Sequence, residues 1–239
     1  MQKTEWNILS TRPLSDEVIG KASLHSVSID CISFIETEPI KNEALTNFIY
    51  GLHSKPITAV FTSMNAVDAV SVYLKEKPQW SVYCMGHTTQ QLVADAFGFD
   101  HIKGTAINAS LLADQIIQDG ITEVYFFCGD QRRDELPHKL RIENINVNEV
   151  TVYHTTHQHQ KIDKKYDGVL FFSPSAVDSF FSINEPQKNT ILFAIGSTTA
   201  DAIIKLSTNT LIIAQQPGKE SLAEEMIAYF SAIQKQQAY

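Results

Sequence analysis

Short apolar runs alternate with longer amphipathic stretches along this chain. The runs are rich in β-branched and aromatic residues, as buried strands are, and they cover residues 6–9, 27–35, 57–61, 81–85, 124–128, 147–153, 168–172, 190–195 and 210–214. The intervening stretches space apolar residues three and four apart, as helices do, at 67–74, 89–97, 111–117, 200–206 and 222–230. Strands that alternate with helices predict parallel sheets covered on both faces.

The pattern also repeats at one fixed separation. FTSMNAVD at 61–68 returns as FFSPSAVD at 171–178, and GHTT at 86–89 returns as GSTT at 196–199. Ser63 and Ser173 are 110 residues apart, and so are Gly86 and Gly196. The matches fall where an apolar run meets a Ser, Thr or Gly cluster, which is the strand-to-helix turn where α/β sheets bind ligands. The repeat predicts two similar domains with a ligand cleft between them.

Two chain paths fit this repeat. Residues 1–36 and 119–155 each hold a pair of predicted strands, whereas 57–118 and 167–230 are the repeated blocks. Either each pair joins the block that follows it, giving two sequential domains, or the first pair joins the last block and the middle of the chain is inserted. The pattern alone leaves both paths open.

Composition narrows the class of protein. The 239 residues are 44% apolar, which suffices for two buried cores, and the formal net charge of −8 disfavours a nucleic acid or an anionic membrane as partner. No apolar run approaches the roughly 18 residues that span a bilayer, and the first residues lack a leader pattern, so we expect a cytoplasmic protein. Cys31, Cys84 and Cys128 lie in or beside apolar runs without CxxC spacing, and we expect buried, reduced thiols.

Seven loops that follow predicted strands share small hydroxyl residues and glycine. They cover residues 10–13, 62–65, 86–89, 128–133, 173–175, 196–199 and 216–221. Such loops let a ligand approach the free N–H groups at the start of the next helix, which attract anions. A polyanionic ligand is one interpretation. Plain helix capping is the other, as Pro174 behind Ser173 and a capping box of Ser221 with Glu224 indicate.

Six short motifs stand in a fixed order along the chain. They are ILSTRP at 8–13, FTS at 61–63, GHTT at 86–89, VYHT at 152–155, FSPSAV at 172–177 and AIGSTTA at 194–200. Each motif is weak alone, but their joint order and spacing resemble those of the uroporphyrinogen-III synthase family over nearly the whole chain.

The resemblance implies an α/β fold of two doubly wound, flavodoxin-like parallel-sheet domains joined by a two-stranded β-ladder. It also selects the second chain path. Residues 1–35 and 157–239 are then the first domain, 38–150 are an inserted second domain, and 36–37 with 151–156 are the linkers.

The activity that this resemblance implies is the cyclisation of hydroxymethylbilane, a linear tetrapyrrole, to uroporphyrinogen III in haem biosynthesis. Water is lost and ring D is inverted through a spiro intermediate, and no cofactor or metal is expected. The substrate carries many carboxylates, which suit loops that present helix N-termini. A monomer is expected, and a transient contact with the preceding pathway enzyme is left open.

Residue roles follow from the resemblance as well. The Tyr of the family's V-Y-x-T motif, its candidate proton donor, falls on Tyr153, with packing between the domains as the alternative. Thr199, a second catalytic candidate, and Ser173 match positions that line the family's cleft, with capping as the alternative. Further substrate contacts are expected from Thr11, Arg12, Ser63, Asn65, Gly86, Thr88, Gly129, Arg132, Ser175, Gly196 and Thr198. Asn65 and Ile191 depart from basic residues that relatives carry.

Other interpretations compete with these assignments. The three histidines 154, 157 and 159 have no Cys or carboxylate suitably near them, so a solvated linker is expected there rather than a metal site. Asp130 and Asp134 bracket Arg132, so pairing on the surface competes with substrate binding. A non-catalytic bilobed protein that binds or senses a small molecule stays open as the second hypothesis, because it would use the same loops. A nucleotide enzyme is disfavoured because neither G-x-G-x-x-G nor a Walker sequence is present.

Overall fold

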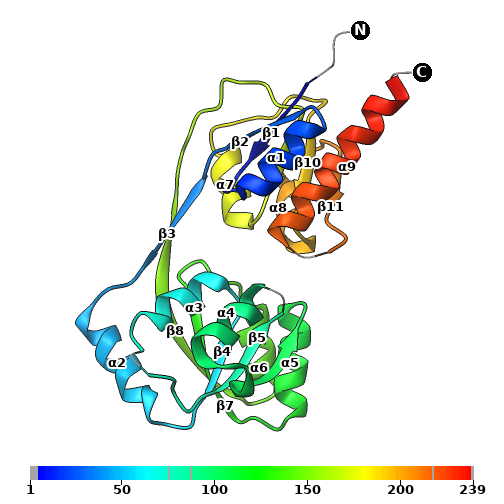
Figure 1. Cartoon of the computed structure of the whole chain (residues 1–239). Helices are drawn as coiled ribbons and strands as arrows, with labels where there is room; N and C mark the ends of the chain where they lie inside the picture. Colours follow the sequence, from blue (N-terminus) through cyan, green and yellow to red (C-terminus); the bar gives the residue numbers. More distant parts are fainter. Residues whose placement is uncertain (1–4, 75, 87, 217, 238–239) are drawn as a thin grey trace. The chain divides into compact units, whose positions relative to one another are not determined.

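The computed structural model describes residues 5–74, 76–86, 88–216 and 218–237 (Figure 1). Contacts between Cα atoms divide the chain into two compact units. Unit 1 comprises Met1–Glu36 with Thr156–Tyr239, and unit 2 comprises Thr37–Thr155. Each unit is an α/β structure built on its own parallel sheet.

Unit 1 combines the first and last parts of the chain in one sheet. Its strand order is β11-β10-β9-β1-β2, and every adjacent pair is parallel. The elements are β1 (Trp6–Ser10), α1 (Asp16–Leu24), β2 (Val27–Cys31), β9 (Gly168–Phe171), α7 (Pro174–Phe181), β10 (Ile191–Ala194), α8 (Ser197–Leu206), β11 (Leu211–Ile213) and α9 (Lys219–Gln237).

Helices cover both faces of the unit 1 sheet, because successive strand residues point to opposite sides. Ile8 and Phe193 pack on the face with α1 and α9, whereas Leu9 and Ala194 pack on the face with α7 and α8. All four side chains are fully buried. Near-continuous apolar strands of this kind are what a parallel sheet buried on both faces requires.

Unit 2 has the strand order β3-β8-β7-β4-β5-β6, in which β8 to β6 are parallel neighbours. Its elements are β3 (Ile35–Pro39), α2 (Glu43–His53), β4 (Thr58–Phe61), α3 (Met64–Ser71), β5 (Ser81–Met85), α4 (Thr88–Phe97), a 3₁₀ turn (Phe99–His101), β6 (Ile102–Ala106), α5 (Ala109–Gln118), β7 (Glu123–Gly129), α6 (Glu135–Ile142) and β8 (Asn146–His157).

The core of unit 2 also has two sides. Phe61 and Phe127 stack with ring centroids 5.2 Å apart beneath α2, α3 and α4, and Trp80 stacks on Phe127 at 5.4 Å. On the other face, Val60 and Phe126 pack with α5 and α6. Large aromatic side chains therefore fill the layer directly below α3 and α4, whose N-termini carry several of the predicted site residues.

The strand β3 runs antiparallel to β8. The Ile40 N–H donates to the Val152 carbonyl at 2.9 Å, and the Gln158 N–H donates to the Phe34 carbonyl at 2.8 Å. The partner number rises as the residue number falls, which is the antiparallel pattern. Both strands cross the boundary between the units at 36/37 and 155/156.

The repeat seen in the sequence is also a repeat of topology. A shift of 110 residues carries β4-α3-β5-α4-β6-α5 of unit 2 onto β9-α7-β10-α8-β11-α9 of unit 1. Outside the repeat, β7-α6-β8 of unit 2 and β1-α1-β2 of unit 1 occupy the same places in the two strand orders. In each unit the chain runs outward along one half of its sheet and then continues in the other half.

Several expectations from the sequence need correction. The run 27–35 is not one strand, because β2 ends at Cys31 and the chain then leaves the sheet for β3. Cys31, at the end of edge strand β2, is exposed, whereas Cys84 and Cys128 are buried as expected. By contrast, residues 151–156, predicted as part of a two-stranded linker, lie in β8, and the boundary between the units at 155/156 falls within this range.

The patterning also missed some elements and misjudged one helix start. It did not predict β6, α1, α2 or α6. Ser221 is the third residue of α9 rather than its cap, and Glu224 pairs with Lys21 instead of closing a capping box. Pro217 of the preceding loop lies outside the described residues, as do residues 1–4 and 238–239 of the expected first domain. No helix in the described ranges combines the length and apolar character needed to cross a bilayer.

Candidate functional site

Each sheet has one point at which consecutive strands start to add to the opposite side. In unit 2 this switch point lies between β4 and β7, and in unit 1 it lies between β9 and β1. Ligands of doubly wound sheets bind outside the carboxyl ends of the strands at such a point, because the flanking loops diverge there. The predicted site residues all follow strands, or lie near strand ends, at this edge in their own units.

At the switch point of unit 2, two hydroxyl groups meet. Ser63 follows β4 and caps α3, its Oγ accepting the Ala66 N–H at 3.2 Å. The Tyr153 hydroxyl, from β8, lies 3.2 Å from the same Oγ. Tyr153 is half-buried and packs against the core below α3. A phenol, a serine hydroxyl and a helix N-terminus are thus brought together.

Gly129 makes room for the Tyr153 ring. It ends β7, and a Cβ built on it would lie 2.4 Å from Tyr153 Cζ and 2.8 Å from its hydroxyl oxygen. The ladder between β7 and β8 slips here, since Cys128 pairs with Thr151 but Gly129 pairs with Tyr153. The extra residue is a β-bulge, a feature that re-aims side chains next to active sites. Only glycine fits beneath the phenol in this arrangement.

The environment of Tyr153 keeps its phenol protonated. Burial raises the pKa of Tyr153 above its ordinary value of 10.0, and the charges that Cys128 and Asp130 can carry act in the same direction. The hydrogen bond with Ser63 lowers the pKa, but by less. At neutral pH the group can therefore donate a proton, although a raised pKa also makes it a weaker acid.

The neighbouring loops of unit 2 add backbone groups at the same edge. Asn65 is the second residue of α3, and Thr88 is the exposed first residue of α4. Gly86 donates its N–H to the Ala106 carbonyl at 2.8 Å, which fixes the turn after β5. His87, between Gly86 and Thr88 in the GHTT motif, lies outside the described residues.

Unit 1 repeats this arrangement around Ser173. Its Oγ accepts the Ala176 N–H at 3.1 Å and caps α7, with Pro174 at the first helical position as the sequence predicted. Ser175 follows on the first turn and is half-buried. The repeat counterparts Ser63 and Ser173 thus make the same cap.

Gly196 and its neighbours begin α8 at the same edge. Gly196 caps the helix in extended backbone and accepts the Thr199 N–H at 3.1 Å. Thr198 is exposed, whereas Thr199 is only 3% exposed. A ligand at this edge would meet Thr198 before Thr199, although the sequence favoured Thr199 as catalytic.

Thr11 and Arg12 follow β1 on the other side of the unit 1 switch point. Thr11 is 2% exposed, and both its N–H (3.0 Å) and its hydroxyl (2.8 Å) donate to the Leu170 carbonyl of β9. Its hydroxyl proton is therefore committed to the neighbouring strand and is not available to a ligand. Arg12 is half-buried, and its carbonyl accepts the Ser10 hydroxyl at 2.5 Å.

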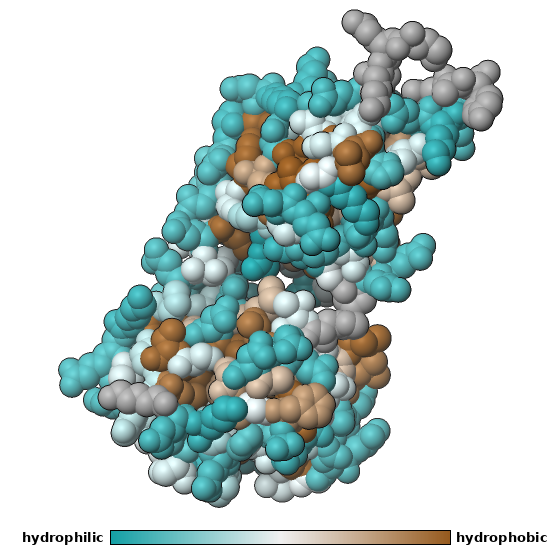
Figure 2. Space-filling view, viewed as in Figure 1, coloured by the Kyte–Doolittle hydropathy of each residue, from teal (hydrophilic) through white to brown (hydrophobic). Residues whose placement is uncertain are grey.

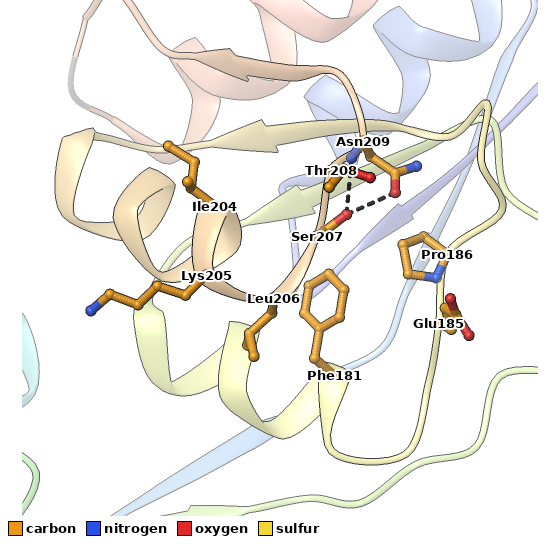
Figure 3. Close-up of a pocket in the computed structure, with 9 residues that line it drawn as sticks. All are labelled: Phe181, Glu185, Pro186, Ile204, Lys205, Leu206, Ser207, Thr208 and Asn209. Atoms are coloured by element: carbon orange, nitrogen blue, oxygen red, sulfur yellow. Dashed lines mark hydrogen bonds between the residues drawn. The ribbon is translucent and has the colours of Figure 1, made fainter.

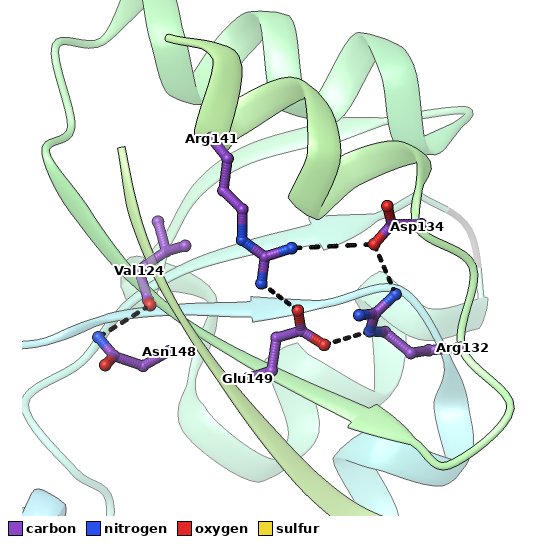
Figure 4. Close-up of polar contacts among 6 residues, drawn as sticks. All are labelled: Val124, Arg132, Asp134, Arg141, Asn148 and Glu149. Carbon is purple, nitrogen blue, oxygen red and sulfur yellow. Dashed lines mark hydrogen bonds and ion pairs between the residues drawn. The ribbon is translucent and has the colours of Figure 1, made fainter. Parts of the chain in front are cut away.

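Arg132, expected among the substrate contacts, belongs to an ion-pair cluster (Figure 4). Its guanidinium bonds to Glu149 of β8 and to Asp134 at 2.9 Å, and Arg141 of α6 pairs with the same two carboxylates. Of the two aspartates that bracket Arg132, Asp134 pairs with it, whereas Asp130 turns to His154. Substrate binding by Arg132 would compete with two carboxylates already in place.

The match to known proteins extends over most of the chain. The family model described as "Uroporphyrinogen-III synthase HemD" matches residues 16–224. The chain belongs to the uroporphyrinogen-III synthase family. As a member of this family it is a cyclising lyase of tetrapyrrole biosynthesis.

Two of the curated relatives of the chain show how far its sequence has diverged within the family. The uroporphyrinogen-III synthase of Saccharomyces cerevisiae is 28% identical over an alignment of 177 residues that covers 62% of this chain and 64% of the yeast protein. That of Schizosaccharomyces pombe is 24% identical over an alignment of 224 residues that covers 83% of this chain and 86% of the relative.

Solved structures of the family share the fold. A mutant uroporphyrinogen III synthase from Thermus thermophilus superposes with a TM-score of 0.67 at 12% identity, covering 96% of this chain and 99% of that one. Uroporphyrinogen-III synthetase from Helicobacter pylori gives 0.63 at 18% identity, covering 94% and 99%. The predicted fold class, α/β with doubly wound parallel sheets, is confirmed.

Two surface hollows lie away from the switch-point loops of this family member. One is bounded by the C-terminal ends of α7 and α8, with Phe181 and Leu206 in its wall (Figure 3), and the other lies between the ends of α3 and α4, beside Leu74 and Phe97. The two are counterparts in the repeat and open at the amino edges of the sheets, where the chemistry of the loops is absent. On the face that Figure 2 shows, hydrophilic side chains predominate and the hydrophobic ones form separate patches.

The described residues hold no group of three or more His, Cys, Asp or Glu side chains that could bind a metal ion. His154 Nδ1 donates to the Asp130 carboxylate at 2.9 Å, and His159 Nδ1 lies 2.9 Å from the Ser182 hydroxyl. Burial raises the pKa of Cys128 to about 11 and that of Cys84 to about 12, so neither thiol is a ready nucleophile or metal ligand. Hydroxyl groups and backbone N–H groups dominate the chemistry of the site.

Proposed function

We propose that Tyr153 supplies the proton with which the hydroxyl of the terminal hydroxymethyl group of hydroxymethylbilane leaves as water. The observation that supports this is the protonated, half-buried phenol held against Ser63 at the unit 2 switch point. General acids contribute on the order of 10² to 10⁴ to a rate. Because the pKa of Tyr153 is raised, we place its contribution at the lower end, about 10².

The reaction that the family resemblance implies follows from this loss of water. The resulting azafulvene is electrophilic, and the substituted carbon of ring D attacks it to form a spiro intermediate. The bond between the spiro carbon and its original bridge carbon then breaks, and the freed bridge carbon bonds to the other side of ring D. One water is released in all, and ring D is inverted in the product, uroporphyrinogen III.

Substrate carboxylates need partners, and helix N-termini offer them in a chain of net charge −8. In unit 1 we propose Ser173, Ser175, Gly196 and Thr198 as contacts, because they begin α7 and α8 at the carboxyl edge. In unit 2 the corresponding contacts are Asn65, Gly86 and Thr88. Arg12 is the proposed cationic contact. Arg132 is a weaker candidate for this role, because its guanidinium is already paired with carboxylates.

The test is a coupled assay with hydroxymethylbilane generated in place and the uroporphyrin isomers separated by chromatography after oxidation. The full chain should give isomer III above the spontaneous isomer I. Tyr153→Phe should lower kcat about 100-fold with KM within about twofold. Tyr50→Phe, which removes an exposed phenol from α2, is the matched control and should keep the full rate.

Two outcomes would contradict the proposal in different ways. If Tyr153→Phe retained full kcat, another group would supply the proton while the synthase activity stood. If the folded chain gave only isomer I, the second hypothesis, a non-catalytic small-molecule binding or sensing protein, would replace the enzyme.

Three predictions about its setting remain. We expect the protein to act in a reducing compartment such as the cytoplasm, and the free cysteines 31, 84 and 128 support this prediction. A monomeric state and a transient contact with the enzyme that supplies hydroxymethylbilane stay predictions from the sequence. The tetrapyrrole substrate itself follows from family membership.

A further inference from the structure

The loop after β7 is hydrogen-bonded to β8 at Tyr153 and at Thr155, two residues further along the strand. The Asp130 N–H donates to the Tyr153 carbonyl at 3.2 Å, and Asp130 Oδ1 accepts the Thr155 N–H at 2.9 Å. The next residue adds a third bond, from Gln131 Nε2 to the Thr155 carbonyl at 2.8 Å. Backbone groups of the two residues 153 and 155 are thus tied to one short loop.

The Asp130 carboxylate is held from two directions. Its Oδ2 lies 2.9 Å from His154 Nδ1, while Oδ1 binds the Thr155 N–H. Burial opposes its ionisation, but the hydrogen bonds from His154 and Thr155 outweigh burial, and the pKa of Asp130 lies below its ordinary value. The charged form that accepts both bonds therefore predominates at neutral pH.

These hydrogen bonds lie next to the β-bulge that orients the Tyr153 side chain. The register of the ladder between β7 and β8 shifts between Cys128 and Gly129. This ladder alone therefore does not fix the orientation of β8 at residue 153. The three bonds from Asp130 and Gln131 begin where regular pairing ends. Hydrogen bonds to this segment of β8 keep the phenol of Tyr153 over Gly129 and within hydrogen-bonding distance of Ser63.

We propose that Asp130 is a positioning residue that holds the part of β8 beside the bulge, and with it the Tyr153 hydroxyl, in the geometry required for proton donation. Asp130 acts through Tyr153 and needs no contact with the substrate itself. The kinetic part of this inference rests on the proposed role of Tyr153. The geometric part can be tested without any reaction.

Kinetics of the full chain test the coupling between the two residues. Asp130→Ala should lower kcat about 10-fold with KM within about twofold, because a small misplacement of a reacting group is costly. In the Tyr153→Phe background the same substitution should lower kcat less than about twofold, since nothing is left to position. Asp130→Asn keeps an acceptor oxygen for the Thr155 N–H and should restore kcat to within about threefold. Equal losses in both backgrounds would overturn the proposal.

Fluorine NMR of the chain labelled with 3-fluorotyrosine reads the geometry directly. The Tyr153 signal is identified among the eight tyrosines by its loss in Tyr153→Phe. Asp130→Ala should shift and broaden it, Asp130→Asn should change it less, and Asp134→Asn, which neutralises another carboxylate of the same loop, should leave it in place. An unchanged signal in a folded Asp130→Ala chain would overturn the proposal even if activity fell.

The two measurements separate this inference from the proposed function. If Tyr153→Phe kept full activity, the proton-donor role would fail, and the fluorine signal would still decide whether Asp130 holds the ring. If the signal moved but the losses in kcat were additive, Asp130 would act on activity by some route other than Tyr153, against the proposal.

Discussion

The two units share one topology but treat their switch points differently. In unit 1 the chain after β1 is fastened across the switch point, because Thr11 donates its N–H and its hydroxyl to the Leu170 carbonyl of β9. In unit 2 the chain after β7 is fastened the other way, onto β8, through Asp130. At this edge of unit 2, the Tyr153 side chain of β8 extends over Gly129 at the end of β7 and places its hydroxyl against Ser63 after β4.

The strands β2 and β8, which occupy the same place in the two sheets, show the same contrast in the aromatic residue that each one leads to. Where the chain leaves β2 in unit 1, Phe34 is fully buried and packs edge-on against Phe180 of α7 with centroids 5.2 Å apart. Where β8 continues in unit 2, Tyr153 stays half-buried and places a hydroxyl against Ser63 below α3. The repeated scaffold therefore holds two capped helices, and among the described residues only the Ser63 cap is seen to pair with a second side-chain hydroxyl.

Gly129→Ala should have the largest effect on this contrast. A methyl group there would meet the Tyr153 ring at 2.4 Å, so the phenol or the β7 strand must move. We expect kcat to fall about 100-fold or more, at least as far as in Tyr153→Phe, together with a stability loss of about 1–3 kcal/mol from overpacking. Isomer analysis and chemical denaturation measure the two effects.

The control for Gly129→Ala is Gly20→Ala in α1, where an added Cβ meets nothing within 4 Å. That change should be neutral or stabilising, because alanine favours a helix interior over glycine. Wild-type activity in Gly129→Ala would mean that the close contact with Tyr153 has no part in the reaction.

The paired caps offer a finer comparison of the two units. Ser63→Ala and Ser173→Ala should each destabilise the chain by about 1 kcal/mol, because each removes an N-cap hydrogen bond of about 3.1 to 3.2 Å. Their kinetic effects should differ. Ser63→Ala also removes the partner of Tyr153 and should lower kcat, whereas Ser173→Ala should mainly raise KM. Equal effects on kcat would argue that the units contribute alike.

Local signals explain how much of this could be predicted from the sequence. The caps at Ser63 and Ser173 stand at the junction of an apolar run and an amphipathic stretch, so their type and place are visible within a few residues. The separation of 110 residues then relates one unit to the other. β6 escaped prediction because Gly104 interrupts it, and that glycine is required by the Tyr83 ring, 2.6 Å from an added Cβ.

The contacts that were missed join residues far apart in the sequence. Asp130 and Thr155 are 25 residues apart, and Ser63 and Tyr153 are 90 apart. No local pattern reports the one-residue bulge that brings them together, since it exists only in the pairing of β7 with β8. The sequence indicated that Arg132 can pair with a neighbouring aspartate, as it does with Asp134, but it did not reveal the second partner, Glu149, which lies on a different element.

The ion-pair cluster of unit 2 should show the smallest effect, visible mainly as a pH dependence. Burial raises the pKa of Glu149, but hydrogen bonds from Arg132 and Arg141 outweigh it, so the folded-state pKa lies below the ordinary 4.5. A carboxylate with a lowered pKa stabilises the fold above its unfolded-state pKa, and this contribution is lost as the pH falls through the folded-state pKa.

Glu149→Gln should therefore cost about 1 kcal/mol at pH 7, since the 22% exposed carboxylate is partly screened by solvent. The difference from the wild-type chain should shrink as the pH falls from about 5 through the lowered folded-state pKa of Glu149, below which both chains lack the charge. Urea denaturation at several pH values measures it, with Glu143→Gln, at the exposed end of α6, as the control. A difference that is constant over this range would mean that Glu149 acts through packing rather than through its charge.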